Sequence, residues 1–184
     1  MVFQTDRLII RKAVSSDSDV EFFFRLWTDL RVMSNVGFPQ GLKITREAIY
    51  SAFEKQAASE FDTRLVAELK TTGEPIGECK LGWPNEDGIS ETDVKLLPEY
   101  WGCGYGTEIK QALVDYLFTH TACRAVKASP NKKNVASQKM QEKVGGKIVG
   151  EHTHRFPEEM RSYTVDVESY IYMVFREDWE RRKK

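Results

Sequence analysis

Hydrophobic residues recur along the chain at two spacings, and each spacing predicts a different kind of element. Steps of three and four place apolar side chains on one face of a helix, whereas steps of two place them on one face of a strand. The longer steps occur in four segments. They predict helices after the Ser15-Ser16-Asp17 cluster, from Thr45 to about Ala58, from Tyr105 to about Leu117, and from Asn134 to Val144.

Short apolar or alternating runs between these segments predict strands. The runs are residues 7–12, 64–70, 75–81, 90–97, 124–128, 147–153 and 168–175. Thr71-Thr72-Gly73-Glu74 separates the second run from the third and predicts a hairpin turn. Because strands and helices mix along the whole chain, we expect an α+β fold.

Composition narrows the class of protein. A length of 184 residues predicts a single domain, residues 1–184, with a core of its own. A net charge of −1 gives no reason to expect a nucleic acid or an anionic membrane as partner. No apolar run approaches the ~20 residues needed to span a bilayer, and charged residues interrupt the N-terminus where a leader would be apolar. We therefore expect no membrane partner and a cytoplasmic location.

Cysteine usage supports the same location. Cys79, Cys103 and Cys123 are an odd number of cysteines at unrelated spacings. Such a set is typical of reduced thiols in a cytoplasm and argues against a disulfide framework.

The most informative segment is a glycine-rich loop between the predicted strand 90–97 and the helix that follows. Gly102, Gly104 and Gly106 alternate in it. Alternating glycines let successive backbone N–H groups converge on one point, where the helix adds the positive end of its dipole. This arrangement predicts a cradle for phosphate or pyrophosphate. The spacing is neither that of a dinucleotide-binding G-x-G-x-x-G nor that of a P-loop.

A second motif lies downstream, in Asn134-Val-Ala-Ser137 and Glu142-Lys-Val-Gly145. Together with Trp101 to Gly106, it resembles the GNAT superfamily of acetyl-CoA-dependent N-acetyltransferases. The nearest resemblance is to the branch that includes the ribosomal-protein N-terminal (alanine/serine) acetyltransferases. The opening residues 5–11 and the closing residues 169–175 resemble the first and last strands of that branch.

The resemblance implies a fold, a co-substrate and a reaction. The fold would be a mixed, largely antiparallel sheet of about six or seven strands with helices on both faces, splayed at the central strands to admit CoA. Acetyl-CoA would be the co-substrate, and no metal would be needed. A primary amine, from a small molecule or a protein N-terminus, would attack the thioester directly.

The resemblance also assigns residues to the co-substrate. The pantetheine arm would pair with the strand ending at Leu96 and Leu97, and a backbone N–H near Leu96 would polarise the thioester carbonyl. Trp101 stands where the family has Gln or Arg, so phosphate binding would be weakened or rearranged rather than lost. Asn134 would serve both as helix cap and as a contact for the arm. The expected co-substrate residues are Leu96, Leu97, Trp101, Gly102, Cys103, Gly104, Tyr105, Gly106, Thr107, Asn134 and Lys139.

The amine must lose a proton before it attacks, because a lysine-like amine has a pKa of ~10. Glu91 and Asp93 are the candidate bases, since they share a face of the strand that leads to the thioester. Solvent-facing charges are the alternative reading of both. Many relatives protonate the leaving thiolate with a tyrosine, and Gln141 stands at that position. Ser137 is the candidate substitute that the Asn-x-x-Ser branch suggests.

Several alternatives stay open on the sequence alone. Cys103 as a covalent nucleophile lacks a histidine within the motif. His152 and His154 lack a third metal ligand at matching spacing. Residues 152–167 and the helix after Thr45 would shape an acceptor cleft that Glu158, Glu159, Asp166 and Glu168 make acidic.

Two other function classes compete with an enzyme. Trp101 and Gln141 favour an acyl-CoA-binding sensor or interaction module with little catalysis. The glycine loop alone would also suit a nucleotide-binding domain. Both a monomer and a homodimer are open, since strand edges can pair between chains.

Overall fold

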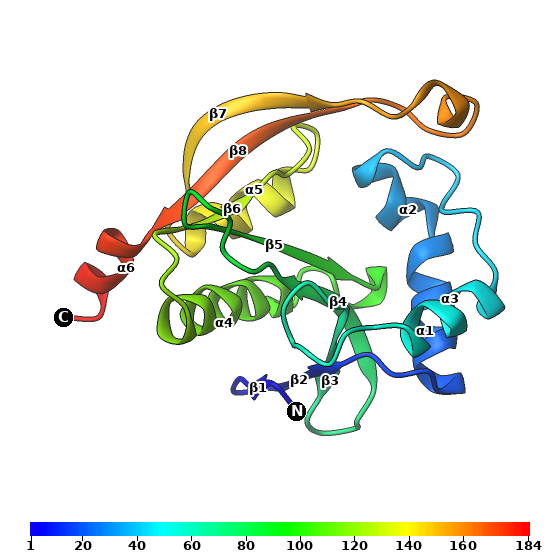
Figure 1. Cartoon of the computed structure of the whole chain (residues 1–184), viewed down its shortest axis with the longest axis horizontal. Helices are drawn as coiled ribbons and strands as arrows, with labels where there is room; N and C mark the ends of the chain where they lie inside the picture. Colours follow the sequence, from blue (N-terminus) through cyan, green and yellow to red (C-terminus); the bar gives the residue numbers. More distant parts are fainter.

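The computed structural model describes residues 1–184, and one eight-stranded sheet runs through it in the order β1-β2-β3-β4-β5-β6-β8-β7 (Figure 1). The neighbouring strands are antiparallel except for the parallel pair β5 and β6. The strands are β1 (Phe3–Gln4), β2 (Leu8–Lys12), β3 (Leu65–Leu69), β4 (Pro75–Leu81), β5 (Ile89–Leu96), β6 (Ala125–Ala128), β7 (Lys147–His154) and β8 (Val167–Phe175). The expected fold class is confirmed, although six or seven strands were expected. The two residues of β1 are too few to leave a periodic signal.

Helices cover both faces of the sheet, as expected. The helices are α1 (Asp17–Thr28), α2 (Leu30–Met33), α3 (Arg46–Glu54), α4 (Tyr105–His120), α5 (Val135–Lys143) and α6 (Arg176–Arg182). Side chains of α1, α2 and α3 pack with Val66 and Leu97 in one core cluster. Side chains of α4 pack with residues of β2, β3 and β4 in a second cluster on the opposite face. The sheet therefore separates two hydrophobic layers.

The helix after Thr45 ends four residues earlier than the apolar pattern predicts. Thr45 caps α3 through its side-chain oxygen, as expected, but the last helical residue is Glu54. The Gln56 side chain instead bonds to the backbone next to β2 and β3, where its amide N–H donates to the Ala13 carbonyl and its amide oxygen accepts from the Arg64 N–H. These tertiary hydrogen bonds compete with a further turn of helix.

The sheet opens at its centre, between the two parallel strands. Residues 89–91 of β5 pair with residues 125–127 of β6, and no pairing between the two strands continues beyond Glu91. Residues 92–96 of β5 stay paired with β4 on the other side. One edge of β5 is thus unpaired over the half that leads to the glycine loop. This is the splay that the family resemblance implied.

Two hydrogen bonds identify the backbone groups of β5 that face β4, and the other backbone groups of β5 face the opening. The Leu97 N–H donates to the Ile76 carbonyl at 3.0 Å, and the Glu91 carbonyl accepts from Gly82 at 2.7 Å. Odd-numbered residues of β5 therefore direct their backbone groups toward β4. Because direction alternates along a strand, Val94 and Leu96 direct theirs into the opening.

A short helix, α6, follows the last strand of the sheet. Arg176 begins α6, and its guanidinium donates to the carbonyls of Phe118, Thr121 and Cys123. These three contacts fix the start of α6 to the end of α4. None of the six helices has the length and apolarity that a bilayer crossing requires.

Candidate active site

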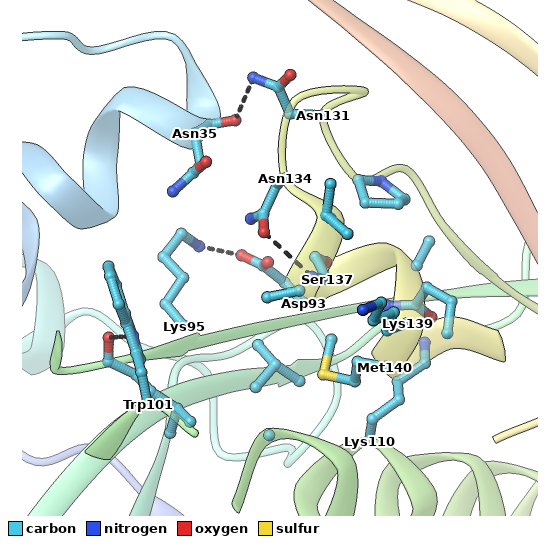
Figure 2. Close-up of a pocket in the computed structure, with 18 of the residues that line it drawn as sticks. Asn35, Asp93, Lys95, Trp101, Lys110, Asn131, Asn134, Ser137, Lys139 and Met140 are labelled. Atoms are coloured by element: carbon cyan, nitrogen blue, oxygen red, sulfur yellow. Dashed lines mark hydrogen bonds and ion pairs between the residues drawn. The ribbon is translucent and has the colours of Figure 1, made fainter. Parts of the chain in front are cut away.

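A cavity of about 750 Å³ occupies the opening between β5 and β6 (Figure 2). The edge of β5 forms one wall, α5 and the loop before it form the facing wall, and α4 contributes to the lining. Residues 31, 32 and 34–36, from α2 and the turn after it, close the remaining side. Four segments that are distant in the sequence thus meet around one space.

The glycine loop borders this cavity at the C-terminal end of β5. Gly102 and Gly104 both have left-handed backbone, with φ of 77° and 82°, and Gly104 is the N-cap of α4. A Cβ on Gly102 would meet no atom within 4 Å, so this face of the loop is open. A Cβ on Gly106 would lie 3.3 Å from the Met140 sulfur. The loop therefore presents bare backbone to the cavity, where α4, β5 and α5 converge.

The structure separates the predicted loop residues into two groups. Gly102, Gly104, Gly106 and Thr107 line the cavity, as do Leu96 and Trp101. Cys103, Tyr105 and Leu97 do not. The Cys103 thiol is exposed, Tyr105 lies beneath the Arg7 guanidinium at 4.2 Å, and Leu97 is buried in the core under α1. Any contact from these three would have to come from backbone groups.

Trp101 interacts with the free edge of β5. Its indole N–H donates to the Leu96 carbonyl at 3.0 Å, and 47% of the residue is exposed. Leu96 directs that carbonyl into the opening. The indole thus takes one hydrogen-bonding position on an edge that otherwise faces the cavity, and it presents a flat apolar surface there.

The facing wall is organised by the N-terminus of α5. The Asn134 side-chain oxygen accepts from the Ser137 N–H at 3.1 Å, which is a helix N-cap. Asn134, Ser137 and Lys139 all line the cavity. Just before the cap, the Asn131 side chain donates to the Asn35 carbonyl at 3.2 Å and joins this wall to the turn after α2 (Figure 2).

The two candidate bases on β5 have different surroundings. Asp93 lines the cavity and pairs with Lys95 from the same strand (Figure 2). Lys95 also lies 3.7 Å from the buried carboxylate of Glu78 on β4. Glu91 is exposed, pairs with Lys127 at 2.7 Å, and does not line the cavity. The structure therefore brings Asp93, and not Glu91, to the site.

Lys95 determines the charge state of Asp93. Burial acts to raise the pKa of Asp93, but the attraction and hydrogen bond of the Lys95 ammonium outweigh it and hold that pKa below its usual range. For Lys95, burial acts to lower the pKa, and the Asp93 and Glu78 carboxylates raise it instead. Both groups are therefore charged at neutral pH.

The cavity lining is strongly basic. One carboxylate, that of Asp93, stands among the basic side chains of Arg31, Lys95, Lys110, Lys133, Lys139 and Lys143. A lining of this charge, next to a glycine loop at a helix N-terminus, suits a polyanion. The acidic cleft that we expected is not part of this cavity, because residues 152–167 and α3 contribute nothing to its lining. Residues 31, 32 and 34–36 take their place.

Lys110 is a site residue that the sequence analysis did not single out. It falls within the apolar stripe of α4, is 1% exposed, and lines the cavity. Its ammonium donates to the Thr92 hydroxyl on β5. Burial lowers the pKa of Lys110 to about 7, although the Asp93 carboxylate acts to raise it. A charged residue inside a helical apolar stripe is the sequence feature that marks it.

Gln141 is buried and lines the cavity, whereas His152 and His154 lie on β7 and are exposed. No group of three or more His, Cys, Asp or Glu side chains is arranged to hold a metal ion.

Residues 7–147 match the family model described as "Acetyltransferase (GNAT) domain". A protein of Bacillus licheniformis named "Uncharacterized N-acetyltransferase p20" is 27% identical over 139 residues, which cover 74% of this chain and 76% of the relative.

Solved structures share the fold over almost the whole chain. A GNAT-family acetyltransferase from Bacillus anthracis has a TM-score of 0.76 at 21% identity, covering 95% of this chain and 98% of its own. Spermidine N-acetyltransferase from Vibrio cholerae, in complex with CoA and spermine, has a TM-score of 0.75 at 19% identity and covers 94% and 98%. AAC(6')-Ib in complex with ribostamycin and coenzyme A has a TM-score of 0.73 at 19% identity and covers 97% and 99%.

Proposed function

Since the chain belongs to the GNAT acetyltransferase family and is an N-acetyltransferase, we propose that it transfers the acetyl group of acetyl-CoA to a single primary amine, by direct attack on the thioester. The observation that carries the proposal is the half-open edge of β5 at the side of a basic cavity. Phosphates match the basic cavity and a peptide-like arm matches the open edge of β5, so only a ligand that has phosphates and such an arm uses the two features together.

Different parts of the site bind the different parts of acetyl-CoA. The backbone N–H groups of residues 102–107 and the N-terminus of α4 bind the pyrophosphate. The pantetheine arm pairs with the free N–H and carbonyl of Val94 and the free N–H of Leu96, as a peptide adds to a sheet edge. The expected backbone donor near Leu96 to the thioester oxygen is the N–H of Val94, the inner of the two free N–H groups on this edge. Asn134 contacts the arm, and Lys139 contributes positive charge for a phosphate.

Asp93 is the proposed general base, acting directly or through a water. It is the one carboxylate that lines the cavity, and its low pKa keeps it ionised to receive the proton of an incoming ammonium. Glu91 is the weaker of the two original candidates because Lys127 holds it outside the cavity. Ser137, which the family resemblance suggests as the acid for the leaving thiolate, lines the cavity at the N-terminus of α5.

For the acceptor, we propose an amine with one positive charge, and a peptide or protein N-terminus in particular. A lining with one carboxylate and several basic groups disfavours a polycation. An α-amino group has a pKa of about 8, so it loses its proton more readily than a lysine-like amine. This acceptor agrees with the resemblance to the ribosomal-protein branch, whereas two structural neighbours are complexes with spermine and ribostamycin.

The remaining assignments are proposals of the same kind. Residues 1–184 act as one domain, because a single sheet links both core layers. The protein works in the cytoplasm, as a monomer or as a homodimer, without a metal.

The test is CoA release from acetyl-CoA in the presence of a panel of short peptides with free N-termini, polyamines and aminoglycosides. We expect saturable turnover with peptides, and none with peptides whose N-terminus is blocked. Turnover only with polyamines or aminoglycosides would contradict the acceptor class and leave the reaction standing. Tight acetyl-CoA binding by calorimetry without turnover for any amine would favour the sensor.

A further inference from the structure

The closed end of the cavity carries a buried polar group that the proposed reaction has not used. The opening narrows toward Glu91, the last residue of β5 that pairs with β6. Thr92 is the first residue beyond that pair, and Lys110 of α4 reaches its hydroxyl. Thr92, Lys110 and Gln141 are each at least nine-tenths buried, and all three line the cavity. The closed end is therefore polar, although the core beneath it is apolar.

The arm of the co-substrate, if it is bound as proposed, ends at this place. It enters from the glycine loop beside Leu96 and follows the free edge past Val94. From Leu96 back to Thr92, the edge covers roughly 13 Å at about 3.3 Å per residue. Beyond Thr92, the pairing of β5 with β6 closes the gap. The thioester sulfur at the end of the arm thus lies beside Thr92 and the amine of Lys110.

Two groups on opposite faces of β5 then border the reacting centre. Asp93 lies on one face, and Thr92 with its partner Lys110 on the other, because neighbouring strand residues alternate. A base on one side and a proton donor on the other are what an acyl transfer from a thioester requires. The amide of Gln141 cannot give up a proton, and the hydroxyls of Thr92 and of the candidate Ser137 are poor acids.

We infer that Lys110 is the proton donor to the leaving thiolate of CoA, an inference that rests on the function proposed above. The acceptor nitrogen forms its bond to the acetyl carbon and passes its proton to Asp93. The carbon–sulfur bond breaks, and the sulfur takes its electron pair and then one proton from the Lys110 ammonium. The neutral amine regains a proton from solvent after CoA leaves.

The surroundings of Lys110 suit this role. Burial gives the ammonium a pKa of about 7, whereas an ordinary thiol has a pKa of about 8.5, so the transfer runs downhill. Among the charged groups around it, Asp93 on β5 raises this pKa, and Lys139 and Lys143 on α5 line the same cavity. The Thr92 hydroxyl accepts from the ammonium and can donate to the neutral amine, so both states keep a partner.

The first test observes the Lys110 side chain directly and needs no turnover. The side-chain signal of Lys110 is followed by NMR during titration with CoA, and it is assigned by its absence in Lys110→Met. We expect CoA to shift this signal and its titration midpoint. Adenosine 3′,5′-bisphosphate, which has the phosphates but no arm, should leave both unchanged. CoA that binds by calorimetry without moving the Lys110 signal would overturn the inference. Failure of CoA to bind would remove the proposed function as well.

The second test separates a proton donor from a structural lysine. Lys110→Met should lower kcat by about 10²- to 10⁴-fold with little change in the KM for acetyl-CoA. It should also remove the loss of kcat that occurs as pH rises through the pKa of Lys110, because only the protonated amine donates. Lys55→Met, at an exposed position beyond α3, is the matched control.

Thermal stability distinguishes a catalytic Lys110 from a purely structural one. Methionine has a similar shape and no charge to desolvate, so the melting temperature of Lys110→Met should stay equal to that of the wild type or rise. A lower melting temperature with kcat within twofold of wild type, and an unchanged alkaline limb, would make Lys110 a structural group only.

Discussion

At the scale of single residues, the two carboxylates on β5 provide a matched pair. Asp93 and Glu91 point to the same face of one strand, yet only Asp93 lines the cavity. We expect Asp93→Asn to lower kcat by about 10²- to 10⁴-fold, the range for loss of a general base, without loss of the fold. Glu91→Gln should stay within a few-fold of wild type. Equal effects of the two substitutions on steady-state kcat would contradict the assignment of Asp93.

Lys95 is expected to set the acidic limb of the pH profile. Asp93 must be ionised to act as a base, so activity is lost as pH falls through its pKa. Lys95→Met removes the ammonium that lowers this pKa and leaves the burial that raises it. The acidic limb of kcat/KM should therefore move to higher pH. Stability follows the same direction. A carboxylate whose pKa is lowered by folding stabilises the protein at pH values above its unfolded-state pKa, and this stability is lost as pH falls through the folded-state pKa. A limb at the wild-type position in Lys95→Met would refute the coupling.

Gly104 tests the phosphate cradle. Its φ of 82° lies in the left-handed region, where a β-branched residue is strained by about 1–2 kcal/mol. Gly104→Val should lower stability by about that amount and abolish CoA binding in calorimetry. Gly73→Val is the control, because Gly73 has a φ of 70° in the β3–β4 turn with nothing near its Cβ. The control should lose similar stability but bind CoA normally. Equal CoA affinity in both variants would remove the loop assignment.

At the scale of elements, Asn134 combines two proposed tasks at the start of α5. Loss of the cap in Asn134→Ala should cost about 1 kcal/mol in denaturant unfolding. Asn134→Ser keeps a capping oxygen and removes the amide, so its stability should stay near wild type while its KM for acetyl-CoA rises. If both variants keep the wild-type KM, Asn134 is a helix cap alone.

Elements with long periodic patterns were predictable, and those held by tertiary contacts were not. The helices capped by Ser16 and Asn134 begin where their caps and apolar steps indicate. The early end of α3 depends on Gln56 bonding to two distant backbone groups, which no local pattern encodes. Likewise, α6 forms where Arg176 binds the carbonyls after α4.

The candidate site divides in the same way. The backbone features, a glycine loop before a helix and a capping asparagine, are local and could be read from the sequence. The difference between Asp93 and Glu91 depends on Lys127 across the β5–β6 pair. Lys110 was missed because a charged residue in an apolar stripe acquires meaning only when its neighbours in space are known.

At the scale of the whole molecule, the opening in the sheet predicts strong linkage between CoA and folding. CoA at about 100 times its Kd should stabilise the protein by ~2.7 kcal/mol, which corresponds to a rise in Tm of about 5–10 °C for a chain of this size. Thermal unfolding with CoA, ATP and NAD measures this. ATP or NAD giving the same shift at equal concentration, or competing with CoA, would favour a nucleotide-binding domain instead.

The unpaired edge of β5 also has a consequence in time. The amides of Val94 and Leu96 belong to a central strand, where slow hydrogen exchange is the rule, yet in the empty protein no neighbouring strand protects them. They should exchange with solvent deuterium as fast as surface loop amides, whereas Lys95, which faces β4, exchanges slowly. Occupancy of the cavity would erase this alternation. The alternation of amide exchange rates along β5 therefore reports whether the co-substrate is bound.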